Sequence, residues 1–101
     1  MKGYKGFDKN LKCRGKQYEI GKTFHEDEAI LCDKGLHFCE SPLDVFTYYP
    51  PADSRYAEIE ASDVSDDTDK DSKRVCKTLK IKCEIGLPGL IKAGVKFIKS
   101  Q

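Results

Sequence analysis

The chain has 101 residues, of which 39% are hydrophobic and 35% are charged, and its formal net charge is +1. This length supports one domain with one thin core, so we expect a single domain over residues 1–101 with little room for a deep catalytic cavity. A net charge near zero provides no global field to hold a polyanion, and nucleic acid is therefore not expected as a direct partner. No apolar run approaches the ~18 residues that a membrane span needs, so no membrane partner is expected either.

The cysteines and the first residues bear on the compartment. Residues 1–5 are followed by polar sequence rather than by the apolar stretch of a signal peptide. The five cysteines form an odd set with no evident disulfide framework, and reduced thiols are the expected state. Both features predict a cytoplasmic protein. The cysteines are Cys13, Cys32, Cys39, Cys76 and Cys83.

Extended segments are predicted first. Residues 2–7 have strand character, and residues 17–24 place apolar side chains at even spacing. Residues 29–32 and 36–39 flank Asp33-Lys34-Gly35, where glycine suits a positive φ, and this pattern predicts a hairpin.

The middle of the chain predicts a short helix, a strand and a loop. Ser41-Pro42 is typical of a helix start, and Pro50-Pro51 ends that helix. Residues 55–61 alternate as a strand, and residues 62–73 form an acidic loop long enough to be mobile. The strand pattern predicts Ala57, Ile59 and Ala61 facing inward, with Tyr56, Glu58 and Glu60 facing outward.

The last two elements are the strongest. Residues 78–85 alternate strictly, which predicts one buried and one wet face, with Leu79, Ile81, Cys83 and Ile85 on the buried side. Pro88 then opens a helix whose apolar stripe is expected to cover the sheet. The stripe consists of Leu87, Leu90, Ile91, Val95 and Ile98. Together these elements predict an α+β fold: a mainly antiparallel sheet with a short central helix and a C-terminal helix packed on one face.

Two possible metal sites fail on spacing. His25, Cys32, His37 and Cys39 are zinc-ligand types, but they lack the closely paired spacing of structural zinc sites. The acidic loop begins like a calcium loop at Asp67, but an EF-hand needs glycine at the sixth position and glutamate at the twelfth. Those positions hold Ser72 and Thr78. We therefore expect no metal and no cofactor. No local signature marks a catalytic cysteine or histidine either, so no catalytic residue is predicted.

Three segments carry a resemblance to a known family: KGYKGFDKNLKCRGKQYEIGKTF, GLHFCESPLDVFTYYP and SRYAEIEAS. They resemble a small domain family of unknown function that is scattered through phage, prophage and bacterial proteins. The shared pattern is K-G-F-D…C-R-G, G-F-H-x-C-x-x-P-L-D-V…Y-Y and R-[YF]-[AF]-E-V-E, and it extends to about Ile85. Leu36 and Phe38 depart from the pattern at strand positions. The resemblance implies a phage-derived origin and a host-cell setting.

The leading functional hypothesis is a non-enzymatic interaction protein that binds a host protein. Inhibition of a host defence system, such as a CRISPR effector, is one outlet, and the oligomeric state stays open. Tyrosine and arginine commonly anchor interfaces, and an acidic loop can meet a charged partner. The predicted contact residues are Tyr48, Tyr49, Arg55, Asp66, Asp67 and Asp69.

The alternative is a nucleotide-binding domain that binds NAD or ADP-ribose or transfers ADP-ribose. The chain is faintly similar to ADP-ribosyltransferase-like folds, which use an early arginine, a Ser-Thr-Ser strand and an E-x-E element. Arg14 matches the first, and Glu58-Ile59-Glu60 matches the last. The Ser-Thr-Ser motif is missing, and the chain is short for that fold. His37 or Ser41 could stand as a loose middle element, and the candidate nucleotide-binding set is Arg14, His37, Glu58 and Glu60.

Overall fold

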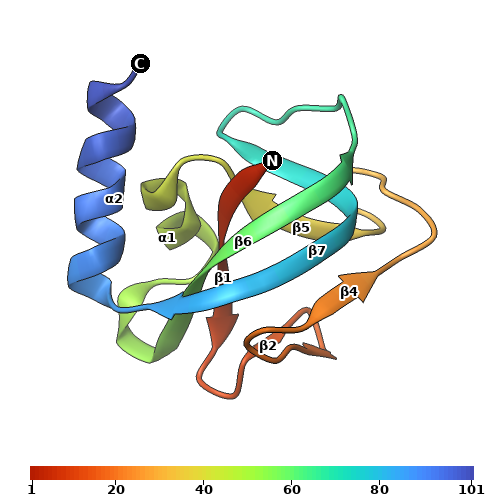
Figure 1. The fold of residues 1–101 in the computed structure, drawn as a ribbon, viewed down its shortest axis with the longest axis horizontal. Helices are drawn as coiled ribbons and strands as arrows, with labels where there is room; N and C mark the ends of the chain where they lie inside the picture. The colour runs from red at the N-terminus through yellow and green to blue at the C-terminus, as the bar shows by residue number, and fades with distance from the viewer.

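The computed structural model describes residues 1–101 as an α+β fold built on a five-stranded, antiparallel sheet (Figure 1). The predicted class is confirmed: a short central helix and a C-terminal helix accompany the sheet. The elements are β1 (Lys2–Asp8), β2 (Lys12–Cys13), β3 (Lys16–Gln17), β4 (Thr23–His25), β5 (Leu36–Cys39), the 3₁₀ turn η1 (Pro42–Asp44), α1 (Val45–Tyr48), the 3₁₀ turn η2 (Pro51–Asp53), β6 (Ser54–Val64), β7 (Lys73–Ile85) and α2 (Leu87–Lys99).

The sheet curls until its strands form a ring. β1 pairs with β6 along its full length, β6 pairs with β7, and β7 pairs with β5. β5 then meets β1 again, but only where Tyr4 lies opposite Cys39. β4 adds to the free edge of β7 beyond the end of β5. The ring therefore has one weakly paired seam, between β1 and β5.

Two apolar clusters hold the fold together. The larger cluster gathers inward-facing side chains of the ring, among them Phe7, Ile59 and Leu79. The smaller cluster, which includes Tyr4 and Leu90, lies between the ring and the helices. Figure 1 shows α1 and α2 on the same side of the sheet. The sheet is thus buried on both faces along part of β1 and β6, which explains why Tyr56, predicted to face outward, is buried in the smaller cluster.

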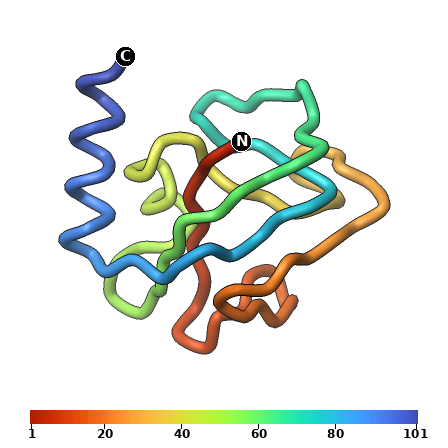
Figure 2. Tube along the Cα trace, in the orientation of Figure 1, coloured from red at the N-terminus to blue at the C-terminus, as the bar shows by residue number.

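Residues 17–24 do not form the continuous strand that alternation predicted. Only β3 and β4, at the two ends of this segment, are extended in ladders, and Gly21 between them has φ +88°. Figure 2 shows this part of the chain as an irregular excursion beside the sheet. The evenly spaced Tyr18 and Phe24 nevertheless pack against the larger cluster. The apolar spacing of this segment therefore predicted correctly that these side chains are buried, but it predicted the backbone conformation incorrectly.

The predicted hairpin around Asp33-Lys34-Gly35 is also wrong. Residues 29–32 form no strand, and one isolated bridge joins Ile30 to Lys34. Cys32 adopts a positive φ of 64°, which ends any extended run. β5 pairs instead with β7, forty residues later, from Leu36 opposite Cys76 onward. The pairing with β7 is favoured over the local hairpin because it buries all four residues of β5.

The strand from residues 78–85 is confirmed and begins earlier, at Lys73. The alternation of inward and outward side chains breaks near the end of β7, because a bulge shifts the register of β7 against β6 between Glu58 and Ile59. Cys83 consequently lies opposite Glu58 and is exposed, although alternation predicted that it would be buried.

The helix α2 forms where it was predicted, but its apolar stripe does not cover the sheet. Leu90 is fully buried, and a Cβ atom on the buried Gly94 would collide with Leu43 of η1. Ile91 and Ile98 face solvent. The glycine lets α2 lie close to η1 along one narrow line, which leaves the rest of the stripe outside the contact.

Candidate functional site

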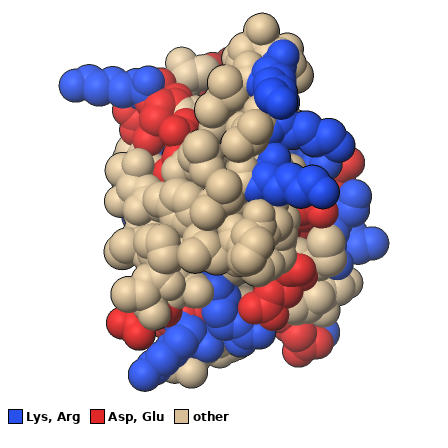
Figure 3. All heavy atoms as spheres, turned by 90° about the vertical axis from the view of Figure 1, so that its left-hand side faces the viewer, with Lys and Arg blue, Asp and Glu red and all other residues tan.

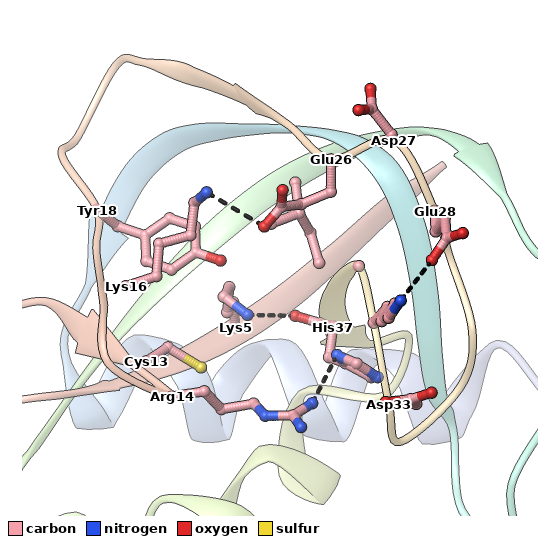
Figure 4. A pocket seen from close by; sticks show the side chains of 13 residues that line it. Lys5, Cys13, Arg14, Lys16, Tyr18, Glu26, Asp27, Glu28, Asp33 and His37 are labelled. Atoms are coloured by element: carbon pink, nitrogen blue, oxygen red, sulfur yellow. Dashed lines mark hydrogen bonds and ion pairs between the residues drawn. The ribbon is translucent and has the colours of Figure 1, made fainter.

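The seam between β1 and β5 contains the most unusual polar groups of the structure. Beyond the single pair of Tyr4 and Cys39, the two strands exchange no ladder bonds. The ammonium group of Lys5 donates a hydrogen bond to the carbonyl oxygen of His37 and so bridges the gap (Figure 4). Two adjoining cavities of about 640 Å³ and 430 Å³ open here. Their linings share Lys5, Cys13, Arg14 and His37.

Lys5 occupies an inward position of β1, and its side chain is only 3% exposed. Its ammonium nitrogen lies 5.1 Å from the centre of the Tyr18 ring. Burial lowers the pKa of Lys5, since a charge away from water is costly. None of the eight ion pairs in the structure includes Lys5, Arg14 or Lys73. Lys5 is therefore a buried basic group without a carboxylate partner, beside the exposed Arg14 and the half-buried Lys73.

His37 is 8% exposed, and both of its ring nitrogens have a near neighbour. Nε2 accepts a hydrogen bond from the backbone N–H of Cys32 at 2.9 Å. Nδ1 lies 3.2 Å from Nη1 of Arg14. Burial lowers the pKa of His37 to about 4, and the charges of Lys5 and Arg14 act in the same direction. The imidazole is consequently neutral at pH 7.

The two cavities differ in their charge balance. Carboxylates surround the larger cavity, but two of them already pair with lysines: Lys16 with Glu26 at 3.4 Å and Lys34 with Glu28 at 3.0 Å (Figure 4). The smaller cavity has no carboxylate in its lining. Its walls are mainly apolar and aromatic, and Lys73 joins the basic residues at its edge.

The zinc-type residues are not brought together. His25 bonds Thr78 on β7, and Cys32 contacts Asp69 of the acidic loop at 3.6 Å. No group of three or more histidine, cysteine or acidic side chains is arranged to hold a metal ion. All five cysteines are free.

A second region of interest is the outer face of α2. Four large apolar side chains, which we call the α2 stripe, are 40–60% exposed at helical spacing. They are Leu87, Ile91, Val95 and Ile98. Figure 3, which looks onto this side of the molecule, shows a broad uncharged surface with basic and acidic side chains around its margin. The helix itself carries Lys92, Lys96 and Lys99 and no acidic residue.

The residues predicted to contact a partner do not form one surface. Tyr48 and Tyr49 both line the smaller cavity of the seam. The hydroxyl of Tyr48 donates to Asp71 at 2.7 Å, which ties the acidic loop to α1. Arg55 lies at the start of β6, whereas the acidic loop follows the end of that strand. Its guanidinium group forms a bidentate ion pair with Glu84, at 2.6 and 2.7 Å. Asp66 and Asp67 are exposed on the loop, and Asp69 lies there beside Cys32.

The residues predicted to bind a nucleotide divide into two pairs. Arg14 and His37 are in contact at the seam. Glu58 and Glu60 line neither seam cavity. Glu58 pairs with Lys2 at 3.0 Å, and Glu60 lies 3.4 Å from the amino group of Met1.

Sequence reasoning missed Lys5, Lys73 and the α2 stripe. A signal for Lys5 was present, because it stands between Gly3 and Phe7 at an inward position of a strand that would otherwise be apolar. Nothing local marks Lys73, which reaches the cavity only because β7 pairs with β5. The stripe was recognised as apolar, but its exposure depends on the close approach of α2 to η1.

None of the helices combines the length and the apolar character that crossing a membrane requires. Comparison with curated proteins and with solved structures finds no match for the chain. A family model does match residues 1–93, from the first strand to the middle of α2. The chain therefore belongs to the family described as Domain of unknown function (DUF7666).

Proposed function

We propose that this domain is a non-enzymatic interaction protein that inserts the α2 stripe into an apolar groove of a partner protein. The observation that carries the proposal is the exposure of four large aliphatic side chains on one face of a regular helix. Residues spaced three and four apart anchor helices in grooves of this kind. The expected anchors are Leu87, Ile91, Val95 and Ile98.

The charge of α2 indicates the chemistry of the partner. At ~100° per residue, Lys92 and Lys99 fall beside Val95, at the edge of the stripe that faces away from the protein's own body. A groove with an acidic rim on that side would complement them. A second copy of the chain is a poorer occupant, because two such helices bring only basic residues and provide no acidic rim.

A membrane surface is also a poorer occupant than a protein. Interfacial helices combine a basic face with aromatic anchors, and the whole molecule is drawn to anionic lipid by its net charge. The α2 stripe is purely aliphatic, and the net charge of the chain is +1. These features support an aliphatic groove of a protein.

A phage-derived origin, which the sequence resemblance implies, would make a host protein the partner. In that setting the partner is a protein of the host cytoplasm, and a component of a defence system, such as a CRISPR effector, is the target that we propose. Occupying a site with a helix needs no catalytic group. The ADP-ribosyltransferase-like alternative would need Glu58 or Glu60 beside Arg14 and His37, and these carboxylates line neither seam cavity.

Site-specific photocrosslinking tests the proposal. A photoreactive phenylalanine analogue replaces Ile91 in one variant and the exposed Lys77 of β7 in a matched control. In extracts of the host, the first variant is expected to crosslink to one protein and the control is not. With that protein purified, Ile91→Asp should weaken binding at least about tenfold, because a buried carboxylate would replace an aliphatic anchor.

Three results would contradict the proposal. The Ile91 variant could crosslink mainly to a second copy of the chain, with a dimer seen by analytical ultracentrifugation. The wild-type protein could bind vesicles of anionic lipid, with Ile91→Asp releasing it. Equal crosslinking from positions 91 and 77 would show that the α2 stripe is not a specific surface.

A further inference from the structure

The smaller cavity of the seam has the features of a ligand site that is independent of the α2 stripe. We propose that it binds a mononucleotide, with the phosphate held by Lys5, Arg14 and His37 and the base lying against the tyrosines of α1. The juxtaposition of three basic groups with no acidic counterpart, at the end of an aromatic-walled cavity, carries this proposal.

The hydrogen bonds of His37 indicate which of its ring nitrogens carries the proton. A backbone N–H can only donate, so Nε2 must present its lone pair to Cys32. The neutral ring then carries its proton on Nδ1. Nδ1–H faces Nη1 of Arg14, and a guanidinium group is also only a donor. Two donors therefore lie 3.2 Å apart, one on the buried imidazole and one on the exposed Arg14, and an anionic oxygen beside the pair could accept from both.

Lys5 adds a third donor to the same place. Its ammonium group has three N–H bonds, and the structure gives one hydrogen bond, to the His37 carbonyl oxygen. No carboxylate lines this cavity, in contrast to the larger one. A phosphate would thus offset the cost of burying the charge of Lys5 and would accept from its free N–H groups.

The turn between β2 and β3 places Arg14 beside the seam. Arg14 has a φ of 52° and Gly15 has a φ of 80°, which is the pattern of a type I′ turn in a two-residue hairpin loop. The side chain of Arg14 is exposed, and its guanidinium group lies 3.2 Å from Nδ1 of His37 (Figure 4).

The rest of the cavity suits a flat ring. Its volume is about 430 Å³, within the range of roughly 300–1,000 Å³ of small-molecule sites. Tyr48 and Tyr49 contribute aromatic wall, and Phe38 and Val45 contribute apolar wall. Tyrosine rings stack on nucleobases of every type. A ligand with a phosphate at one end of the cavity and a base at the other is a nucleotide.

Titration calorimetry with AMP, ribose 5-phosphate and adenosine tests the two halves of the proposal separately. AMP is expected to bind with a Kd below about 1 mM, and both fragments are expected to bind at least about tenfold more weakly. Long-range ¹H–¹⁵N spectra should show the Nδ1–H tautomer of His37 in the free protein, with the Nδ1 signal moving when AMP is added.

Arg14→Gln is the test variant, because Arg14 is exposed and forms no ion pair, so the fold should tolerate the change. Lys12→Gln is the matched control: it removes one positive charge two residues away, from a side chain that lines neither cavity. Arg14→Gln should weaken AMP binding at least about tenfold, and Lys12→Gln by less than about twofold, because only the first removes charge-assisted hydrogen bonds.

Four results would overturn the proposal. No heat with AMP at about 10 mM would exclude the site at any useful affinity. Adenosine that binds as tightly as AMP would remove the role of the phosphate, and ribose 5-phosphate that does so would remove the role of the base. Equal effects of Arg14→Gln and Lys12→Gln would show general electrostatic attraction instead of a built site.

Discussion

The α2 stripe and the seam place side chains in opposite ways. On α2, large aliphatic groups face solvent, although burial would stabilise them. At the seam, Lys5 and His37 are buried among apolar groups, although solvent would stabilise the lysine. Each arrangement costs free energy in the isolated monomer. A partner protein on α2 would offset the first cost, and an anionic ligand at the seam would offset the second. Each region can therefore be tested through stability as well as through binding.

The largest expected effect separates the two sides of α2. Leu90→Ala should lower the free energy of unfolding by about 2–5 kcal/mol, because it removes a fully buried side chain and leaves a cavity. Ile91→Ala, one residue further, should change it by less than about 0.5 kcal/mol, because the exposed side chain contributes little to the monomer. Urea denaturation followed by circular dichroism measures both, and equal losses would show that the stripe is buried in solution.

The next effect concerns the buried histidine of the seam. Its pKa is lowered from 6.5 to about 4 by burial and by the nearby positive charges, so the unfolded chain binds the proton more tightly. This contribution to stability is fully present above pH 6.5 and is lost as the pH falls toward 4, by up to about 3 kcal/mol.

Unfolding free energies measured between pH 7 and pH 4 check this prediction, with His37→Gln as the reference. The variant cannot take up the proton, so its stability should fall less steeply over the same interval. Parallel curves for the two proteins would mean that His37 titrates normally and that the seam is open to water.

A smaller effect is expected where the seam meets the acidic loop. Tyr48→Phe removes the hydrogen bond that the hydroxyl donates to Asp71 at 2.7 Å, and we expect a loss of about 1 kcal/mol because the site is partly exposed. Amide hydrogen exchange in residues 65–72 should become faster. Unchanged exchange would show that the contacts of Asp44 and Ser72 hold this loop without the tyrosine.

The smallest effect is expected far from both regions. Arg55→Gln breaks the ion pair with Glu84, but both side chains are exposed by more than a third, and such pairs contribute about 1 kcal/mol at most. The loss should shrink further at high salt. Partner capture through α2 and AMP binding should both be unchanged in this variant, and a loss of either would place Arg55 in a contact surface after all.

Sequence patterns predicted the elements that depend on their own residues. Strict alternation over residues 78–85 and the Pro88 start of the last helix were enough to place β7 and α2. The predictions failed where contacts with a segment distant in the sequence determine the conformation. The hairpin predicted at residues 29–39 does not form, because β5 pairs with β7 instead. The inward position of Cys83 is lost to a bulge, since one step along β6, from Glu58 to Ile59, corresponds to two steps along β7, from Cys83 to Ile81.

The same limit explains what could be predicted of the sites. Arg14 and His37 were matched by a faint family resemblance, and the structure brings them into contact. The buried Lys5 could have been found from its strand position, but its missing counter-ion is a property of the folded seam. The stripe shows the limit most clearly, because helical periodicity identifies an apolar face without indicating whether the protein itself covers it.

The exposure of the α2 stripe is the claim on which the proposed function depends, and methyl NMR with a soluble paramagnetic agent measures it directly. At a concentration where the protein is a monomer, the agent should broaden the methyl signals of Ile91, Val95 and Ile98 and should spare those of Leu90. Methyl groups of Ile91 and Val95 that stay as sharp as those of Leu90 would show that the protein covers this face itself, and the proposed docking surface would not exist.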